Sequence, residues 1–564
     1  MNKGFFKKIW MLLIFFIPVL IVAGCTRASQ RKQTDLKSFY GIMSDNEYVI
    51  LLEGENIGKA YKEGDEIYLP YELVNNEIND RFYLDKENNR IFYTDIAVQS
   101  FDIGSDSNTK VIKDTVYISF NCIKDRTEMN GTVYENPNRV VISQNFGTIS
   151  VCKPVKDNVI RQYNRDNSDY MAEVSEGESL IIKEKMNESW YRVVKDNGIT
   201  GYIKANETNG EETEERQSSY KKPEYTHITM DQKVCMGWHQ VTSKAANNTL
   251  EEVTRNAKGI LNVISPTWLK LADTTGNISS LAQASYVEKA HNMGMQVWVL
   301  ADDFSYGEDG SYFVSAVLGN YDSRQRLINN LVSEVINCNA DGLNIDYEKI
   351  YEEMADDYIQ FIRELSIECR KNGLVLSVDT YVMQSYNEFY NRKGIAEAAD
   401  YLVIMGYDEH WAGDNSAGSV ASLPYVKKGI EDAKVCADAK RIINGIPFFT
   451  RVWTETKEGL TSEGTYVEDP INGNYWLTSI AVGMDSAEQK LSSQGITPTW
   501  LEDLGQYYGE YEAEGIRERI WLEDERSVQE KLNVMSEAGI GGVACWKLGL
   551  EKAAVWEEIQ EYMK

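Results

Sequence analysis

The chain has 564 residues, enough for several domains, and its 43% hydrophobic and 26% charged residues are typical of a globular protein and exclude an intrinsically disordered one. Its formal charge of −29 argues against nucleic acid or another polyanion as a partner. Net charge bears on solubility and association, so fold and function have to come from the order of the residues.

The first 24 residues have the layout of a secretory signal peptide, with three lysines followed by an apolar run from Ile9 to Ala23. The stretch Val22-Ala23-Gly24-Cys25 resembles a bacterial lipobox, which implies cleavage before Cys25, lipidation of its thiol and membrane attachment through the acyl chains. An uncleaved anchor helix is the alternative. Either interpretation predicts export, to the outer face of the cell membrane or the cell wall of a Gram-positive-type bacterium.

Cysteine and histidine give no sign of a metal or a disulfide framework. The other seven of the eight cysteines are scattered without a C-x-x-C pair, which favours buried small side chains. The four histidines are dispersed, so no metal site and no cofactor are expected.

Two small β domains are predicted before the main one. After a tether at 26–47, residues 48–147 hold short β-like segments between Asp, Asn and Gly turns. This pattern is similar to the small N-terminal domain of copper amine oxidases found in exported Gram-positive proteins, without implying a metal. A generic β spacer is an equal alternative.

Residues 148–206 close on Trp190-Tyr191-Arg192-Val193 and then Gly198 to Ile203, which resembles a bacterial SH3 domain. Trp190 and Tyr202 are either core residues or part of a groove that grips peptide or glycan. The polar residues 207–224 indicate a linker.

From residue 225 to 564 apolar strands alternate with amphipathic helices. Eight strands predict an α/β fold, a closed parallel (β/α)8 TIM barrel. The long span between strands seven and eight predicts an inserted subdomain at about 454–516. A doubly wound sheet is the alternative, but it requires a Gly-rich phosphate loop after strand one, and Gly237-Trp238-His239 is not one. The expected strands are Lys233–Gly237, Leu261–Ser265, Gln296–Leu300, Gly342–Asp346, Leu374–Val378, Tyr401–Met405, Ile442–Ile446 and Gly542–Trp546.

The fourth of these strands leads into Asp346-Tyr347-Glu348. Because side chains alternate along a strand, Asn344, Asp346 and Glu348 fall on one face and the apolar residues between them on the other. In a barrel the polar row faces inward and climbs to the carboxyl-end rim, where such enzymes carry out their chemistry. Two acids in apolar surroundings can have different pKa values, so that one stays ionised while the other keeps a proton.

The stretch from Asp341 to Glu348 resembles the D-x-x-D-x-D-x-E signature of glycoside hydrolase family 18, the chitinase-like hydrolases. Three of the four acids are present as Asp341, Asp346 and Glu348. Asn344 stands at the position that, in the family, helps set the charge on the middle acid. Met405-Gly406-Tyr407-Asp408 is similar to the family's M-x-Y-D segment, and Cys545-Trp546 stands where the family has the Trp beneath the reacting sugar.

The resemblance implies substrate-assisted retaining catalysis, in which the 2-acetamido oxygen of the sugar attacks the anomeric carbon. Glu348 is then the acid and later the base, Asp346 holds the acetamido N–H and stabilises the developing charge, and Tyr407 donates to the acetamido oxygen. Asn344 orients Asp346. The expected substrate-binding residues are Asn344, Asp341, Met405, Asp408, Trp546 and Trp238.

The predicted function is an exported, lipid-anchored hydrolase of β-1,4 bonds next to N-acetylglucosamine. The domain architecture, a wall lipoprotein with an SH3-like domain, favours peptidoglycan over chitin as the substrate. A chitinase, a non-catalytic glycan-binding wall protein and a wall scaffold are the alternatives. A monomer is expected. The segment Leu300-Ala301-Asp302-Asp303-Phe304 departs from the family pattern, and Glu409, His410 and Trp411 either shape an aglycone site or cap a strand.

Overall fold

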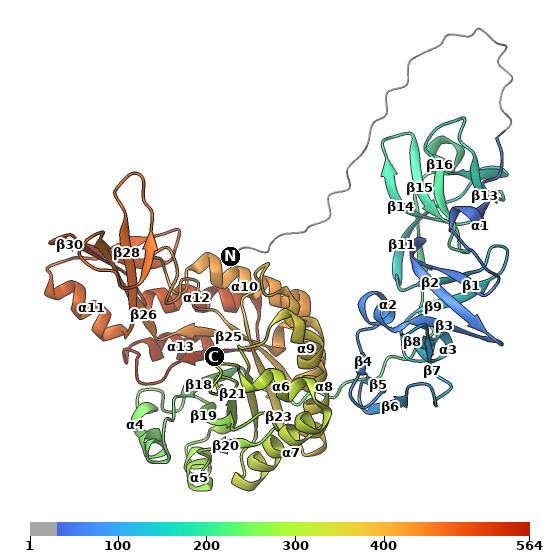
Figure 1. Cartoon of the computed structure of the whole chain (residues 1–564). Helices are drawn as coiled ribbons and strands as arrows, with labels where there is room; N and C mark the ends of the chain where they lie inside the picture. The colour runs from blue at the N-terminus through green and yellow to red at the C-terminus, as the bar shows by residue number, and fades with distance from the viewer. Residues whose placement is uncertain (1–30) are drawn as a thin grey trace. The chain divides into compact units, whose positions relative to one another are not determined.

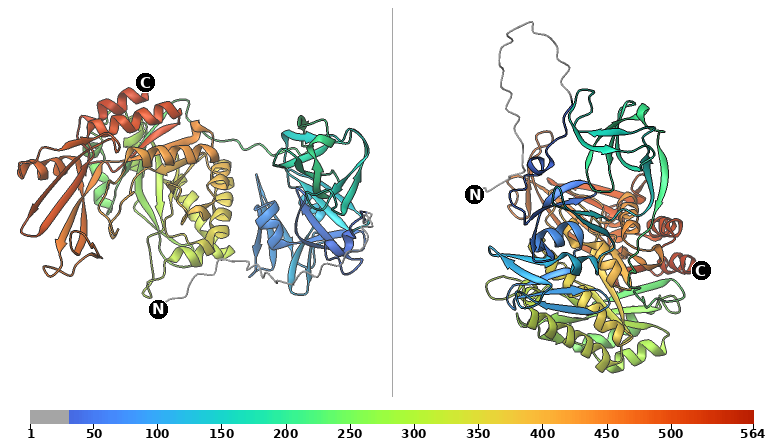
Figure 2. Two further views of the ribbon diagram at one scale, coloured as in Figure 1. Left: turned by 90° about the horizontal axis from the view of Figure 1, so that it is seen from above. Right: turned by 90° about the vertical axis from the view of Figure 1, so that its right-hand side faces the viewer.

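The computed structural model describes residues 31–564, so the predicted signal peptide and the lipidation site at Cys25 lie outside the described residues. The described chain divides into two compact units. The first comprises residues 31–69 and 120–220, and the second comprises 70–119 and 221–564. Figures 1 and 2 show the elements of each unit from three directions.

The first part of unit one is a sheet with strand order β3-β2-β1-β10-β9, in which β1 and β10 run parallel. The short helices α1 and α3 flank it, and Asp35 caps α1 by accepting from the backbone N–H groups of Lys37 and Ser38. The elements are α1 (Leu36–Phe39), β1 (Glu47–Leu52), β2 (Glu55–Glu63), β3 (Glu66–Pro70), α3 (Phe120–Lys124), β9 (Asn130–Tyr134) and β10 (Arg139–Ser143).

The second part of unit one is a sheet with strand order β13-β12-β16-β15-β14-β11-β17. Val49 and Leu51 of β1 share one hydrophobic cluster with Cys152, Ile160 and Leu180, so the two β modules have a common core. The strands are β11 (Gly147–Cys152), β12 (Asn158–Arg161), β13 (Tyr170–Val174), β14 (Leu180–Met186), β15 (Trp190–Val194), β16 (Thr200–Lys204) and β17 (Glu212–Arg216).

Strand β17 lies inside segment 207–224, whose polar composition indicates a linker. It pairs antiparallel with β11, and Glu214 forms an ion pair with Lys153 at 2.8 Å. Backbone pairing at a sheet edge tolerates polar side chains on both faces, which is why composition does not reveal this strand. In the same sheet Trp190 is buried, with Arg161 and Lys204 over its ring.

Unit two contains the predicted (β/α)8 barrel, which is confirmed. Each barrel strand pairs parallel with the next, and β18 closes the ring by pairing with both β19 and β32. The short β20 (Ile278–Ser280) adds antiparallel to β19. The barrel strands are β18 (Val234–His239), β19 (Val263–Leu271), β21 (Gln296–Asp302), β22 (Gly342–Asp346), β23 (Val375–Tyr381), β24 (Tyr401–Met405), β25 (Ile442–Pro447) and β32 (Gly542–Trp546).

Helices cover the outside of these strands (Figure 1). The longest, α7, begins where the Asn320 side chain accepts from the Ser323 N–H, and it ends at Asn339 in the left-handed conformation. The helices are α4 (Leu250–Val253), α5 (Ala284–Asn292), α6 (Phe313–Gly319), α7 (Tyr321–Cys338), α8 (Ala355–Lys371), α9 (Arg392–Ala398), α10 (Leu423–Cys436), α12 (Glu525–Ala538) and α13 (Val555–Met563).

An insertion separates β25 from α12, in the span where the sequence predicts one. It is an antiparallel sheet with strand order β27-β28-β26-β31-β30-β29 that carries α11. The fully buried Lys531–Glu523 ion pair at 3.0 Å joins α12 to the end of β31. The elements are β26 (Phe449–Lys457), β27 (Thr465–Val467), β28 (Tyr475–Gly483), α11 (Met484–Ser493), β29 (Thr499–Leu501), β30 (Gln506–Ala513) and β31 (Ile516–Leu522).

Residues 70–119 belong to the barrel unit, although they lie within the stretch predicted as one small β domain. Their sheet, β4-β5-β6, packs on α7 and α8 through polar contacts. The Tyr83 hydroxyl donates to Asp357 at 2.6 Å, Gln360 donates to Thr94 at 2.9 Å, and Arg363 pairs with Asp80 at 2.9 Å. The elements are α2 (Tyr71–Leu73), a π-helical turn (Val74–Ile78), β4 (Phe82–Asp85), β5 (Arg90–Thr94), β6 (Val98–Asp102), β7 (Thr109–Ile112) and β8 (Thr115–Ser119).

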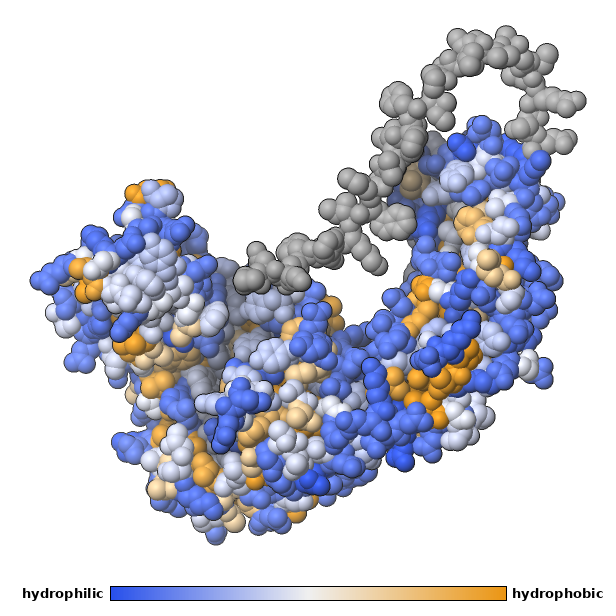
Figure 3. All heavy atoms as spheres, in the orientation of Figure 1, coloured by the Kyte–Doolittle hydropathy of each residue, from blue (hydrophilic) through white to orange (hydrophobic). Residues whose placement is uncertain are grey.

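Hydrophilic residues cover most of the visible surface of both units, as expected for a chain of charge −29 (Figure 3). Within residues 31–564, no helix is both long enough and apolar enough to cross a membrane.

Candidate active site

A cavity of about 130 Å³ opens at the carboxyl ends of the barrel strands. Seven of the nine residues predicted to act on or bind substrate line it, contributed by the strands β18, β22, β24 and β32 or by the residues that follow them. Asp379 and Tyr381 of β23 complete the lining. The lining residues are Trp238, Asp346, Glu348, Asp379, Tyr381, Met405, Tyr407, Asp408 and Trp546.

The alternation along β22 directs the acids inward. Leu343, Ile345 and Tyr347 are buried on the helix side, where the Tyr347 ring stacks on Phe361 of α8 with ring centroids 5.5 Å apart. Asp346 and Glu348 point to the opposite face and reach the cavity. Packing of the apolar face against α8 therefore fixes which side chains enter the site.

Asn344 lies one step below the cavity and does not line it. Its Nδ2 donates to Asp379 Oδ1 at 2.7 Å and to Ser377 Oγ at 3.1 Å. Its Oδ1 accepts from Trp238 Nε1 at 2.9 Å and from Ser265 Oγ at 3.1 Å. This fully buried amide therefore joins four barrel strands beneath the acids.

Asp341 lies at the other end of β22, away from the cavity. Its Oδ2 accepts from the Val297 backbone N–H at 2.7 Å and pairs with His291 Nε2 at 2.8 Å. This position does not support the prediction that Asp341 binds substrate. The carboxylate, five positions before Asp346 along the chain, instead fixes the amino end of β22 against β21.

Glu348 is held from two sides. The Tyr381 hydroxyl donates to its carboxylate, while the buried Asp303 accepts from the backbone N–H groups of Glu348 at 2.9 Å and Lys349 at 2.7 Å. Burial raises the pKa of Glu348, and the hydrogen bond from Tyr381 opposes that rise. A glutamic acid with a raised pKa at the wall of a cavity is suited to donate a proton near neutral pH.

Other carboxyl groups crowd the same end of the barrel. Burial raises the pKa of Asp346 and Asp379 well above the usual range, and the nearby Glu348 raises both further. Burial also raises the pKa of Asp303 to about 7, and it raises the pKa of Asp302, where Lys270 at 3.3 Å opposes the rise. The site therefore retains protons that exposed carboxyl groups would have lost.

Aromatic rings form the walls around the acids. The Trp238 ring meets Trp546 edge-on with centroids 5.9 Å apart and meets Tyr407 at 6.4 Å. Gly445 leaves room for Tyr407, because a Cβ there would lie 3.0 Å from the Tyr407 ring and press on it. Flat apolar rings with polar groups at one side are the surfaces on which proteins bind sugar rings and other amphipathic ligands.

Asp408 follows Tyr407 in the left-handed backbone conformation, with φ 57°. Aspartate tolerates this conformation better than most residues, and here it turns the side chain into the cavity. Its Oδ1 lies 3.8 Å from Arg451 Nη2 of β26 in the insertion. The insertion thus supplies a cation at the edge of the site.

The residues after Asp408 stabilise the loop. Glu409 accepts from both the backbone N–H and the hydroxyl of Ser422, which is the N-cap of α10, and His410 pairs with Asp414 at 3.0 Å. Trp411 is 56% exposed. Glu409 therefore anchors the N-terminus of α10 and His410 braces the loop itself, while the choice between an aglycone site and a strand cap stays a prediction.

Sequence reasoning missed Asp379, Tyr381 and the support from Asp303. Ser377, Asp379 and Tyr381 alternate along β23 as Asn344, Asp346 and Glu348 do along β22, so the same period-two pattern could have identified them. Asp303 lies in the segment that departs from the family pattern, where its burial could not be read from the sequence.

Among residues 31–564 no group of three or more His, Cys, Asp or Glu side chains is arranged to hold a metal ion. Cys152, Cys235, Cys338, Cys369 and Cys545 are buried thiols.

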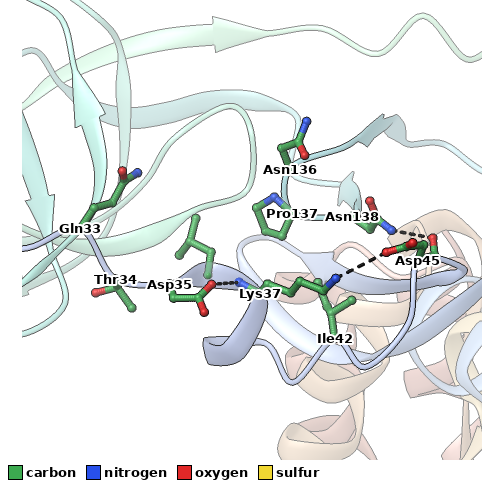
Figure 4. Close-up of a pocket in the computed structure, with 10 residues that line it drawn as sticks. Gln33, Thr34, Asp35, Lys37, Ile42, Asp45, Asn136, Pro137 and Asn138 are labelled. Atoms are coloured by element: carbon green, nitrogen blue, oxygen red, sulfur yellow. Dashed lines mark hydrogen bonds and ion pairs between the residues drawn. The ribbon is translucent and has the colours of Figure 1, made fainter.

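A second cavity, of about 420 Å³, lies in unit one (Figure 4). Its polar groups are engaged with one another: Lys37 lies 3.4 Å from Asp45, and Asn138 donates to the Asp45 carbonyl at 2.8 Å. Asp35 is committed to capping α1. This cavity has no paired buried acids, so the barrel cavity is the candidate active site.

Most of the barrel unit is similar to known proteins. The model of the family "Glycosyl hydrolases family 18" matches residues 199–551, well over half of the chain. Among curated proteins the chain is similar to the glycosylase YvbX of Bacillus subtilis, 25% identical over 52% of this chain and 82% of that protein. It is also similar to the cortical fragment-lytic enzyme of Bacillus anthracis, 24% identical over 45% of this chain but only 57% of that enzyme.

Among solved structures, the fold is similar to that of the Bacillus cereus spore cortex-lytic enzyme SleL. The TM-score is 0.50 at 20% identity, covering 69% of this chain and 89% of SleL. At this identity the likeness shows the fold.

Proposed function

Since the chain belongs to glycosyl hydrolases family 18 and is a glycoside hydrolase, we propose that it cleaves β-1,4 bonds next to N-acetylglucosamine in peptidoglycan, with Glu348 as the proton donor. The observation that carries the proposal is the environment of Glu348. It is an acid of raised pKa at the cavity wall, fixed by Tyr381 and Asp303 and flanked by Asp346 on the same strand face.

The proposed reaction proceeds in two steps. Glu348 donates its proton to the leaving glycosidic oxygen while the acetamido oxygen of the same sugar attacks the anomeric carbon. Asp346 lies beside Glu348 and stabilises the positive charge that develops on the acetamido group. Water then opens the cyclic intermediate and returns a proton to Glu348, so the configuration at the anomeric carbon is retained.

The aromatic residues and the hydroxyl group have separate parts in this proposal. Trp546 and Trp238 support the reacting sugar, and the Tyr407 hydroxyl holds the acetamido oxygen in position for attack. Met405 and Asp408 complete the contact surface.

Peptidoglycan as substrate is supported by the relatives. A cortical fragment-lytic enzyme and a spore cortex-lytic enzyme are among the proteins to which the chain is similar. Export, lipidation at Cys25 and location at the outer membrane face or wall rest on the sequence of the first 25 residues and are part of the same proposal.

Digestion of purified peptidoglycan tests the function. Residues 31–564, a Glu348→Gln variant and a Glu353→Gln variant are incubated with it, and the released fragments are identified by mass spectrometry. Glu353 is an exposed acid after the same strand and serves as the matched control. We expect new reducing ends at N-acetylglucosamine with the wild type and Glu353→Gln, and a loss of at least about 100-fold with Glu348→Gln.

New reducing ends at the sugar that alternates with N-acetylglucosamine in peptidoglycan, or full activity in Glu348→Gln, would contradict the proposal. Activity on chitin oligomers but not on peptidoglycan would identify a chitinase instead.

A further inference from the structure

Two carboxyl groups lie side by side on neighbouring strands of the barrel. The register of β22 and β23 pairs Asn344 with Ser377 and Ile345 with Val378. The next residues along the two strands are Asp346 and Asp379, which both line the cavity. Asp379 is 2% exposed and Asp346 is 8% exposed.

The hydrogen bonds of this pair are incomplete. Asp379 Oδ1 accepts from Asn344 Nδ2 at 2.7 Å. Asp346 Oδ1 is buried and has no hydrogen-bond partner within the described part of the chain. A buried carboxylate oxygen without a donor is unfavourable, and a proton on a neighbouring carboxyl group supplies the missing donor.

The surrounding charges favour a proton in this place. Acids and phenols face the pair from β21, β22, β23 and β24, whereas the nearby cations lie against other acids: Lys270 against Asp302, Lys349 beside Glu348 and Asp303, and Arg451 near Asp408. The facing groups are Asp302, Asp303, Glu348, Tyr381, Tyr407 and Asp408. Two adjacent buried carboxyl groups cannot both be ionised at low cost in such surroundings.

We propose that Asp379 is a positioning residue for Asp346: the two carboxyl groups share one proton, and Asn344 holds Asp379 in place for this sharing. The inference deepens the proposed function and rests on it. Asn344 and Asp379 form one hydrogen bond between an amide and a carboxyl group. Exchanging the two side chains, with aspartate at position 344 and asparagine at position 379, would preserve that bond with its donor and acceptor reversed.

Sharing keeps the proton count balanced through the reaction. Before bond cleavage Glu348 carries one proton and the Asp346/Asp379 pair carries another. When Glu348 transfers its proton to the leaving oxygen, the shared proton moves to Asp379 and Asp346 faces the positive acetamido group as a carboxylate. When water attacks, its proton goes to Glu348, and the pair returns to its starting state without exchange with solvent.

The test compares the pH profiles of kcat and KM for wild type, Asp379→Asn, the swapped variant Asn344→Asp/Asp379→Asn, and Ser377→Ala. The swapped variant keeps one amide and one carboxyl group at the two positions. Ser377→Ala removes another hydrogen bond of Asn344 and is the control for a merely structural effect.

We expect Asp379→Asn to lower kcat by about 100-fold with little change in KM, the loss that a misplaced reacting group produces. Its profile should also show one ionisation in place of the two coupled ionisations of the pair. The swapped variant should regain at least about tenfold in kcat and the two-step profile. An Asp379→Asn profile like that of the wild type, or a folded swapped variant no faster than Asp379→Asn, would overturn the inference.

Infrared titration of protonated carboxyl groups in the wild type and the swapped variant gives a readout that does not require turnover or a folded Asp379→Asn chain. Two coupled ionisations, one above the usual aspartate range, are expected in both proteins. Independent titration of every carboxyl group would overturn the inference. An inactive wild type with a coupled pair would instead contradict the proposed function alone.

Discussion

At the scale of single residues, the site depends on how the protonation of Glu348 is set. Burial and the hydrogen bond from Tyr381 act on its pKa in opposite directions. The donor must be protonated to act, so its pKa fixes the alkaline limit of activity.

Tyr381→Phe removes the donor hydroxyl and leaves burial unopposed. The pKa of Glu348 should rise, and the alkaline limb of kcat/KM should move to higher pH by about 1 unit, since a hydrogen bond to a charged group contributes about 1.5 kcal/mol or more. Kinetics from pH 4 to 9 measure this. Tyr386→Phe, at a 75% exposed tyrosine on the next loop, is the control and should leave the profile unchanged. A shift of the alkaline limb to lower pH in Tyr381→Phe would show that the Tyr381 hydroxyl does not stabilise the ionised form of Glu348.

Asp303 should make the stability of the protein depend on pH. Burial raises its pKa to about 7 in the folded state, compared with about 3.9 in an unfolded chain. Between these values the folded state binds the extra proton, so its free energy of unfolding falls as pH rises, by about 4 kcal/mol in total. In Asp303→Asn the melting temperature should depend less on pH between about 4 and 7 than in the wild type.

Asp273→Asn is the matched control for that experiment. Hydrogen bonds, first from Asn277, lower the pKa of Asp273 to about 2, so its contribution is lost as pH falls through 4 to 2 and is constant between 4 and 7. An equal slope for wild type and Asp303→Asn would mean that Asp303 stays ionised throughout.

At the scale of elements, the barrel strands were predictable because buried parallel strands are short apolar runs with helical periodicity between them. The acids of β22 were found through their spacing. The β4-β5-β6 sheet could not be assigned to the barrel unit, because its polar contacts with α7 and α8 join residues more than 200 positions apart, such as Tyr83 and Asp357. No local pattern encodes such a pairing.

That sheet should stabilise the barrel. The Arg324 guanidinium, fully buried against Glu364, lies 4.9 Å from the centre of the Tyr83 ring. Without residues 70–119, Gln360 loses its hydrogen bond to Thr94 and Arg363 loses its hydrogen bond to Asp80. A chain of residues 221–564 should melt about 5 °C or more below one in which residues 70–119 are joined to it by a Gly/Ser linker, since each unpaired buried group costs about 1–3 kcal/mol. Calorimetry compares the two, and equal melting temperatures would refute the role.

At the scale of the whole molecule, the charge of −29 should govern adsorption to intact walls, whose peptide carboxylates are also anionic. Raising salt from 0.01 to 0.15 M shortens the screening length from about 30 Å to about 8 Å. Binding to walls should increase over this range, while hydrolysis of neutral soluble oligosaccharides stays constant. Sedimentation with walls and a soluble-substrate assay separate the two effects, and weaker wall binding at higher salt would indicate a dominant cationic contact.

The charge of the cavity lining also bears on which sugars can occupy the site. Of its nine residues four are acids, and none is Lys, Arg or His. The carboxyl groups of the lining that are ionised repel a sugar that bears its own carboxylate when it enters the reacting position, whereas a neutral amido sugar meets no such repulsion. If the chain acts on a polymer that alternates the two kinds of sugar, as proposed above, we expect this repulsion to restrict cleavage to every second bond, without a contact that recognises the rejected sugar.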